Sequence, residues 1–356
     1  MEKPNIFERL VHDQRSKTIH GISLVARRGF AEDIAACYTL HRSLDLPYSG
    51  SSWRALPDMW RALLLEGTMK LSLVEDRTKP LGSRIVSFNA IIFATDEFCS
   101  EARSTLPPYL SVELAGKYLS GRLPVLNREQ VARANARSGL NVLLCFEGWA
   151  YDGLSREQFL ALREKQSEAL RLAIAGNQVK EFLAAQIGEK NLQWMLDAGT
   201  RVRRDYSDCF RKANVPKQES SQWPWLVGLT KEEAFAKPGS NIAGLFIYTP
   251  PRFHFNRSQQ ALLQHALMGG TTEKLADSLS LSPWTVKKRW RAIYERVADV
   301  DRELLAPSIA CSVHASSRGA ERRRHLLNYL RQHLEELRPY DRRSVRSRIS
   351  RRSDYG

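Results

Sequence analysis

Apolar residues recur along the first 250 positions in two patterns, one typical of strands and one typical of helices. Strand-like runs cover residues 22–27, 69–75, 85–94, 141–146, 200–206 and 242–248. Apolar residues at helical spacing cover residues 29–42, 56–65, 155–173, 178–187 and 192–198. Residues 107–138 fit neither pattern clearly, and the polar stretch 211–225 indicates a surface connection. This order predicts a mixed α/β domain.

A domain boundary is predicted near residue 250. Pro250 and Pro251 are consecutive, and two prolines cannot continue a β ladder. Beyond them the apolar pattern is helical. The predicted fold class is therefore α+β: a mixed α/β domain at residues 1–250, an all-α helix-turn-helix domain at 251–306, and a C-terminal helix with an Arg-rich tail at 307–356.

Residues 255–297 contain signals for three helices, at 258–268, 273–279 and 283–297. Gly269 and Gly270 end the first helix, because glycine accepts the left-handed conformation after a helix. Thr271 or Thr272 is a natural N-cap for the second helix, and Ser282 followed by Pro283 is a strong start for the third. The expected inner faces consist of Leu275, Ala276 and Leu279 on the second helix and Val286, Trp290 and Ile293 on the third. This spacing predicts a helix-turn-helix.

The net charge of +15 is concentrated behind this boundary. From Arg252 to the end there are 21 basic and 11 acidic residues. A local excess of positive charge is what a polyanion-binding module shows, because each phosphate contact releases a counterion. Lys287, Lys288 and Arg291 lie on the expected outer face of the third helix, with Trp284 and Thr285 at its start. A solvated basic face is the alternative interpretation.

The segment LSPWTVKKRWRAIYERV resembles the C-terminal DNA-binding domain of LuxR-type response regulators and quorum-sensing activators. The resemblance implies base contacts from Lys287, Lys288 and Arg291. It implies phosphate contacts near Thr271, Thr272, Ser282 and Thr285, with Trp284 beside them. The family usually has glycine where this chain has Ser280, and a left-handed serine would cost roughly 1 kcal/mol. The fourth region of sigma factors shares the TVK-x-R pattern and is a rival within the same class.

A further helix is expected at residues 320–338. Its leucines repeat at three- and four-residue steps, at Leu326, Leu327, Leu330, Leu334 and Leu337. This stripe either packs on the helix-turn-helix or pairs with a second copy of the chain.

The element order over residues 20–250 is similar to that of a GNAT acyltransferase scaffold: a strand, two helices, strands, then a helix and a strand. The resemblance implies an R/Q-x-x-G-x-G/A turn at a helix start, where backbone N–H groups bind the pyrophosphate of acyl-CoA. The nearest candidate, Ala175–Gln178, lacks the second glycine. A degenerate ligand-sensing or structural domain is therefore an equal alternative to an acyl-CoA enzyme.

Other chemistry has no clear signal in the sequence. The five cysteines include no CxxC pair, and HExxH, GxSxG and GxxxxGK motifs are absent. Cys145 in its apolar run is expected to be a small buried hydrophobe. No catalytic residue, cofactor or metal is predicted, and no run approaches the ~18 apolar residues of a membrane-spanning helix. A cytoplasmic location is expected.

Two functions follow as expectations. The first is a DNA-binding transcriptional regulator whose N-terminal domain senses a signal or mediates assembly, with double-stranded DNA as partner, a homodimer expected, no membrane contact and an unknown small-molecule signal. The alternative is an N-acyltransferase with a basic C-terminal docking module. A protein-interaction role for the C-terminal domain is a third interpretation.

Overall fold

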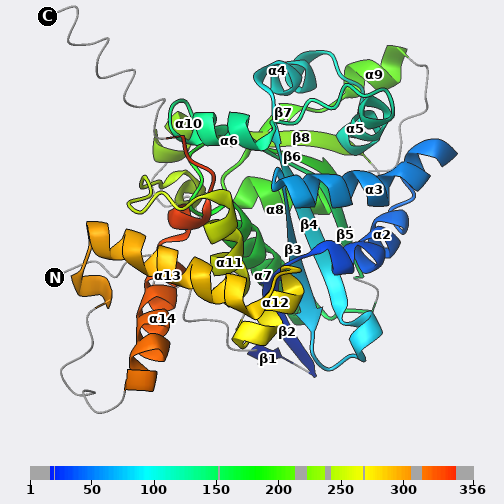
Figure 1. The fold of residues 1–356 in the computed structure, drawn as a ribbon. Coiled ribbons are helices and arrows are strands. Elements are labelled where there is room, and N and C mark those ends of the chain that lie inside the picture. The colour runs from blue at the N-terminus through cyan, green and yellow to red at the C-terminus, as the bar shows by residue number, and fades with distance from the viewer. Residues whose placement is uncertain are drawn as a thin grey trace, which may run out of the picture. The chain divides into compact units, whose positions relative to one another are not determined.

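The computed structural model describes residues 17–19, 21–150, 153–212, 223–236, 242–267, 269–305 and 315–341. These residues divide into two compact units along the chain, one up to Ile247 and the other from Tyr248 onward. The first unit is a mixed α/β structure, and the described part of the second consists of helices and their connections (Figure 1).

Within the described residues of the first unit, eight strands form one sheet in the order β1-β2-β3-β4-β5-β6-β8-β7. Neighbouring strands run antiparallel, except for β5 and β6, which run parallel. The strands are β1 (Lys17–Ile19), β2 (Ile22–Arg28), β3 (Met69–Asp76), β4 (Ile85–Ala94), β5 (Leu140–Trp149), β6 (Val179–Ile187), β7 (Arg201–Arg204) and β8 (Pro224–Thr230).

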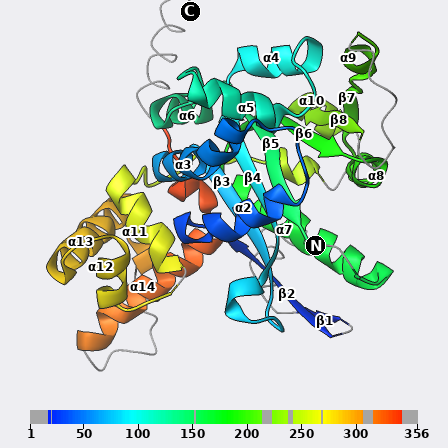
Figure 2. The same ribbon diagram turned by 90° about the vertical axis from the view of Figure 1, so that its right-hand side faces the viewer.

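Helices cover both faces of this sheet. They are α2 (Ile34–Arg42), α3 (Gly50–Glu66), α4 (Asp96–Ser104), α5 (Leu110–Leu119), α6 (Arg128–Asn135), α7 (Arg156–Ile174), α8 (Glu189–Asp197), α9 (Ser207–Lys212) and α10 (Lys231–Ala236), with 3-10 turns η1 (Ala31–Asp33), η2 (Leu81–Ser83) and η3 (Ala243–Phe246). Figure 2 shows α2 and α3 lying across β3 and β4. On the opposite face α7 packs on β2 and β3.

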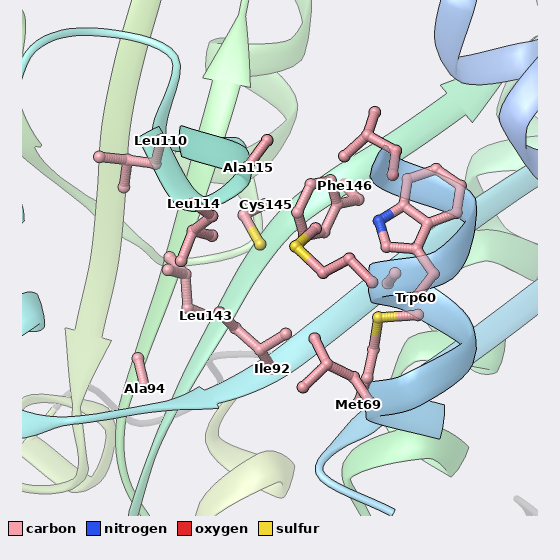
Figure 3. Close-up of a cluster of buried hydrophobic side chains, with 14 of the residues drawn as sticks. Trp60, Met69, Ile92, Ala94, Leu110, Leu114, Ala115, Leu143, Cys145 and Phe146 are labelled. Atoms are coloured by element: carbon pink, nitrogen blue, oxygen red, sulfur yellow. The ribbon is translucent and has the colours of Figure 1, made fainter. Parts of the chain in front are cut away.

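The larger core lies between the sheet and helices α2 to α5. Trp60 of α3 is fully buried and packs edge-on against Phe146 of β5, with ring centroids 5.4 Å apart. Figure 3 shows this pair, with Cys145 near Leu114 of α5. Burial of such large side chains stabilises the fold by roughly 1.5–3 kcal/mol each. The second core, on the other face, includes side chains of β5, β6, α8 and η3.

Two predictions for this unit are wrong. Residues 178–187 were expected to be helical and form strand β6, because pairing with β5 on one side and β8 on the other outweighs local helix propensity. Residues 242–248 were expected to be a strand. They contain η3, whose Leu245 and Phe246 bury themselves in the second core. Most of the expected surface connection at 211–225 lies outside the described residues, and its last residues begin β8, where Pro224 holds the first position, at which a strand tolerates proline.

One close approach in this fold depends on glycine. A Cβ atom at Gly148 of β5 would lie 2.6 Å from Cε1 of Phe88 and 2.8 Å from the backbone carbonyl carbon of Leu40 in α2. We therefore expect Gly148→Ala to lower the free energy of unfolding by about 1–3 kcal/mol, as overpacked core positions do. Urea denaturation followed by circular dichroism measures this. Gly82→Ala is the control, because a Cβ atom there meets nothing within 4 Å.

The described helices of the second unit surround one core. They are α11 (Arg257–Leu267), α12 (Thr272–Ser278), α13 (Pro283–Val300) and α14 (Ala315–Gln332), with 3-10 turns η4 (Glu303–Leu305) and η5 (Leu334–Leu337). The predicted bounds of the first three hold within three residues. The predicted inner-face residues Leu275, Ala276, Val286, Trp290 and Ile293 are buried.

The last predicted helix begins earlier than expected, at Ala315, and ends earlier, at Gln332. Residues 334–337 form the separate turn η5 after His333, whose backbone leaves the helical region. Leu326 and Leu330 are fully buried against α11 to α13, and Leu337 joins the same core. The leucine stripe therefore packs within the chain. The Arg-rich tail lies outside the described residues.

Ser280, between α12 and α13, has a left-handed backbone with a φ of 52°. A residue with a Cβ atom is strained there by roughly 1–2 kcal/mol. Ser280→Gly is expected to raise the free energy of unfolding by about 1 kcal/mol in urea denaturation. Ser278→Gly, at the end of α12, should lower it instead, because glycine weakens a helix. Equal effects of the two variants would contradict the strain argument.

Candidate functional site

The two parallel strands of the first unit diverge at their C-terminal ends. The last pair in the ladder is Leu144 with Ala184, although β5 continues to Trp149 and β6 to Ile187. Just beyond this pair, Cys145 forms a β-bulge: on the neighbouring strand β4, Ala90 pairs with Phe146 and Ile91 pairs with Leu144. A bulge bends its strand. The gap leaves backbone groups with which an extended ligand can pair, as in strand addition.

A buried histidine contacts β5 at this gap. Nδ1 of His41 lies 2.7 Å from the carbonyl oxygen of Glu147, and its Nε2 lies 2.8 Å from the hydroxyl of Tyr48. Since a carbonyl only accepts, Nδ1 carries the proton, and Nε2 accepts from Tyr48. Burial lowers the pKa of His41 to about 4, although the bond to the carbonyl opposes this. His41 is therefore neutral at pH 7, and it fixes the position of β5.

A small cavity of about 20 Å³ lies at this gap, with room for about one water molecule. Four parts of the fold supply its walls: the α2–α3 connection, the start of α5, the diverging ends of β5 and β6, and the segments around Tyr206 and Trp225. The lining residues are His41, Leu44, Leu46, Tyr109, Leu110, Ser111, Cys145, Glu147, Ala185, Gln186, Ile187, Tyr206, Pro224 and Trp225.

Glu147 is the ionisable group of this lining that suits proton transfer. Its side chain is buried, and burial raises its pKa from 4.5 to about 7, although the positive charge of Arg163 and a hydrogen bond with Gln186 act against this. Arg163 is itself held by Asn191 Oδ1 at 2.8 Å and Gln166 Oε1 at 3.1 Å. A carboxylate with a pKa near 7 is suited to act as a general base at neutral pH.

Two other groups of the lining are held protonated. Burial raises the pKa of the Cys145 thiol well above its usual range, so this thiol is not an activated nucleophile. Burial also raises the pKa of Tyr206. Its hydroxyl is buried without a hydrogen-bond partner among the described residues. Cys145 is buried as expected, although it also lines the cavity.

Glu147 was not predicted as a site residue. The signal was present, because it follows the apolar run NVLLCF directly, and a carboxylate within a buried strand needs a reason. The sequence does not show the partners, since His41 is 106 positions away.

The loops at the divergent ends of β5 and β6 lead directly into helices α7 and α8, whose N-termini favour negative charge. The segment Ala175–Gln178, the nearest match in the sequence to a pyrophosphate turn, connects α7 to the start of β6, at the opposite end of the parallel pair. At the relevant end, Ser155 and Gln158 form a reciprocal capping box on α7.

The residues predicted to contact DNA lie on α12 and α13. Thr271 and Ser282 are the N-caps, accepting from the backbone N–H groups of Lys274 and Thr285, and Thr272 is the first residue of α12. Trp284 is 69% exposed, and Nζ of Lys288 lies 5.3 Å from its ring centre.

Lys287 and Arg291 are exposed but line a groove of about 710 Å³ whose other side is α14, with Arg322 and Arg323. Arg291 is also paired with Glu295 at 3.0 Å. All three predicted cations are exposed: Lys287 and Arg291 lie along this groove, and Lys288 lies beside Trp284.

No family model matches the chain, residues 255–297 included, and no curated protein matches it. Solved structures resemble the N-terminal region. The C-terminal condensation domain of Ebony in complex with beta-alanyl-dopamine has 14% identity and a TM-score of 0.35, covering 59% of this chain and 99% of that one. A mutant of the SpeG spermidine N-acetyltransferase from Vibrio cholerae has 9% identity and a TM-score of 0.34, covering 58% and 93%. FdhC, a nucleotide-linked sugar GNAT, has 6% identity and a TM-score of 0.33, covering 62% and 94%. At these values they carry no conclusion about activity or substrate.

The interpretation as a LuxR-type DNA-binding regulator is corrected by these findings. No family model matches the helical segment. The first unit has the predicted order of strand β2, helices α2 and α3, strands β3 to β5, then α7 and β6, with helices α4 to α6 between β4 and β5.

The described part of the chain contains no group of three or more His, Cys, Asp or Glu side chains able to hold a metal ion. No helix in this part has the length and apolar character to span a membrane.

Proposed function

We propose that the first unit transfers an acyl group from a thioester to an amine, with Glu147 as the general base. The observation that carries this proposal is the position of Glu147: a buried carboxylate with a pKa near 7, at a gap between two diverging parallel strands. Structural carboxylates are normally exposed or paired with a cation, and a strongly perturbed carboxyl group beside a cavity is a candidate for catalysis.

The thioester fits the gap for a chemical reason. An acyl group carried on an amide-containing arm, as in acyl-CoA, can lie along β5 and β6 beyond Leu144 and Ala184, where the two strands no longer pair with each other. The N-termini of α7 and α8 lie at the same ends of these strands, where they favour the phosphates of such a donor. The bulge at Cys145 opens the space for the arm.

The step balances as follows. The amine nitrogen attacks the thioester carbonyl carbon, a C–N bond forms, and Glu147 accepts the proton that the nitrogen loses. The C–S bond then breaks, the electron pair leaves with sulfur, and the proton held by Glu147 passes to the thiolate. A general base of this kind accelerates such a reaction by typically 10²–10⁴-fold.

A calorimetric titration of the full-length protein with acetyl-CoA, together with a thiol-release assay, tests the proposal. We expect micromolar binding and release of free thiol that depends on added amine. Neither binding nor amine-dependent thiol release with acetyl-CoA would overturn it.

A further inference from the structure

The cavity beside Glu147 carries very little charge. Of the described residues that line it, Glu147 alone carries a carboxylate, and none is Lys or Arg. His41 adds no charge at neutral pH, because burial lowers its pKa to about 4. A second ammonium group of a substrate would find no second carboxylate among these lining residues.

The rest of the lining is aromatic and aliphatic. Tyr109, Tyr206 and Trp225 contribute rings, and the aliphatic members are Leu44, Leu46, Leu110, Ala185 and Ile187. Such a wall suits an apolar body with a ring, because aromatic groups pack edge-to-face with gains of about 0.5–1.5 kcal/mol beyond simple burial.

Two donors of this lining are left unused. The hydroxyl of Tyr206 and the indole N–H of Trp225 are buried without a hydrogen-bond partner among the described residues. A buried donor without a partner costs roughly 1–3 kcal/mol. Native structures keep such donors where a ligand or a water molecule accepts the missing hydrogen bond.

Strained backbone surrounds the same cavity. Asp45, Tyr109 and Tyr206 have φ angles of 49°, 65° and 59°. Asp45 lies between the lining residues Leu44 and Leu46, and the two tyrosines belong to the lining itself. Non-glycine residues hold this conformation at a cost of about 1–3 kcal/mol, and such residues cluster at ligand-binding sites. The cavity has room for about one water molecule, so a larger ligand requires these three strained segments to move.

We infer that this cavity is the acceptor site and that its acceptor is a monoamine on an aromatic body, an arylalkylamine, rather than a polyamine. This inference rests on the proposed function, because it names the acceptor of that reaction. The amine lies against Glu147, and the ring lies among Tyr109, Tyr206 and Trp225. Exclusion of polyamines follows from the absence of a second carboxylate in the described lining.

Direct binding tests this without any thioester. The full-length protein is titrated calorimetrically with 2-phenylethylamine, with spermidine and with the uncharged 2-phenylethanol. We expect 2-phenylethylamine to bind one per chain and at least 10-fold more tightly than spermidine. Equal or tighter binding of spermidine overturns the inference, and so does the absence of 2-phenylethylamine binding. Acyl transfer to spermidine without binding of 2-phenylethylamine would refute the acceptor class and leave the proposed function standing.

Variants locate the site. Glu147→Gln should lower the affinity for 2-phenylethylamine at least 10-fold and leave the affinity for 2-phenylethanol unchanged, because only the amine pairs with the carboxylate. Leu44→Glu, at a half-buried position of the lining, adds a second carboxylate and should strengthen spermidine binding at least 10-fold.

Ala185→Phe should abolish binding of both aromatic ligands, because the larger side chain fills the cavity. Ala292→Phe, at an exposed position of α13 in the second unit, is its control and should change nothing. Binding unaffected by Glu147→Gln and Leu44→Glu, in folded proteins, would place the ligand elsewhere and overturn the inference.

Discussion

Glu147→Gln is expected to lower the rate of acyl transfer by about 10²–10⁴-fold while the affinity for acetyl-CoA stays unchanged. Glutamine has nearly the same shape as glutamate but cannot accept the proton of the attacking amine. In the unmodified protein the rate should rise with pH around an apparent pKa of about 7, because the carboxyl group must lose its proton before it can act as a base. The variant should lose this step in its pH profile. Steady-state thiol release between pH 5.5 and 8.5 measures both effects.

Glu181→Gln is the matched control for this measurement. Glu181 is a buried glutamate on the neighbouring strand β6, paired with Nη1 of Arg103 at 2.6 Å, and it does not line the cavity. Its substitution should leave the pH profile unchanged. A Glu147→Gln variant that keeps the full rate and the same pH profile would refute the role of Glu147 as base.

Glu147→Gln is also expected to make the protein more stable at alkaline pH. Folding raises the pKa of Glu147 from 4.5 to about 7, so the folded state favours the neutral carboxyl group. Below pH 4.5 the carboxyl group is protonated in the folded and in the unfolded protein, so it does not lower the free energy of unfolding. Above pH 7 it is ionised in both, and the folded protein then bears the full cost of burying the charge. The difference between these pKa values corresponds to about 3 kcal/mol.

Stability from this group is therefore present at low pH and lost as pH rises from 4.5 through 7. We expect Glu147→Gln to raise the free energy of unfolding by about 3 kcal/mol at pH 8, and the gain should largely disappear at pH 4.5. Urea denaturation at the two pH values measures this. Glu181→Gln should instead lower stability at pH 8, because it leaves Arg103 without its partner. A destabilised Glu147→Gln at pH 8 would mean that the buried carboxylate is stabilised by its neighbours, contrary to the argument.

Local signals in the sequence were sufficient where neighbouring residues decide the structure. The Ser282-Pro283 start and the Thr271 cap placed α13 and α12, because an N-cap bonds to backbone only a few residues away. The strand containing Cys145 was found from its unbroken apolar run. These predictions did not establish what the helices contact. The assignment of Lys287, Lys288 and Arg291 to DNA came from motif likeness, and α14, which lines the groove beside two of them, was not part of that likeness.

By itself the sequence determined most of the alternation of strands and helices and the inward-facing stripes of the helices, since each depends on spacing along the chain. Only the tertiary structure decided that residues 179–187 are a strand, that this strand runs parallel to β5, and that the pair separates at Cys145. The candidate site depends on that separation. At this separation Glu147, His41 and Tyr206 line one cavity. Burial there raises the pKa values of Glu147 and Tyr206 and lowers that of His41. Pairing and desolvation are non-local, because they arise from residues that are distant in sequence and adjacent only after folding.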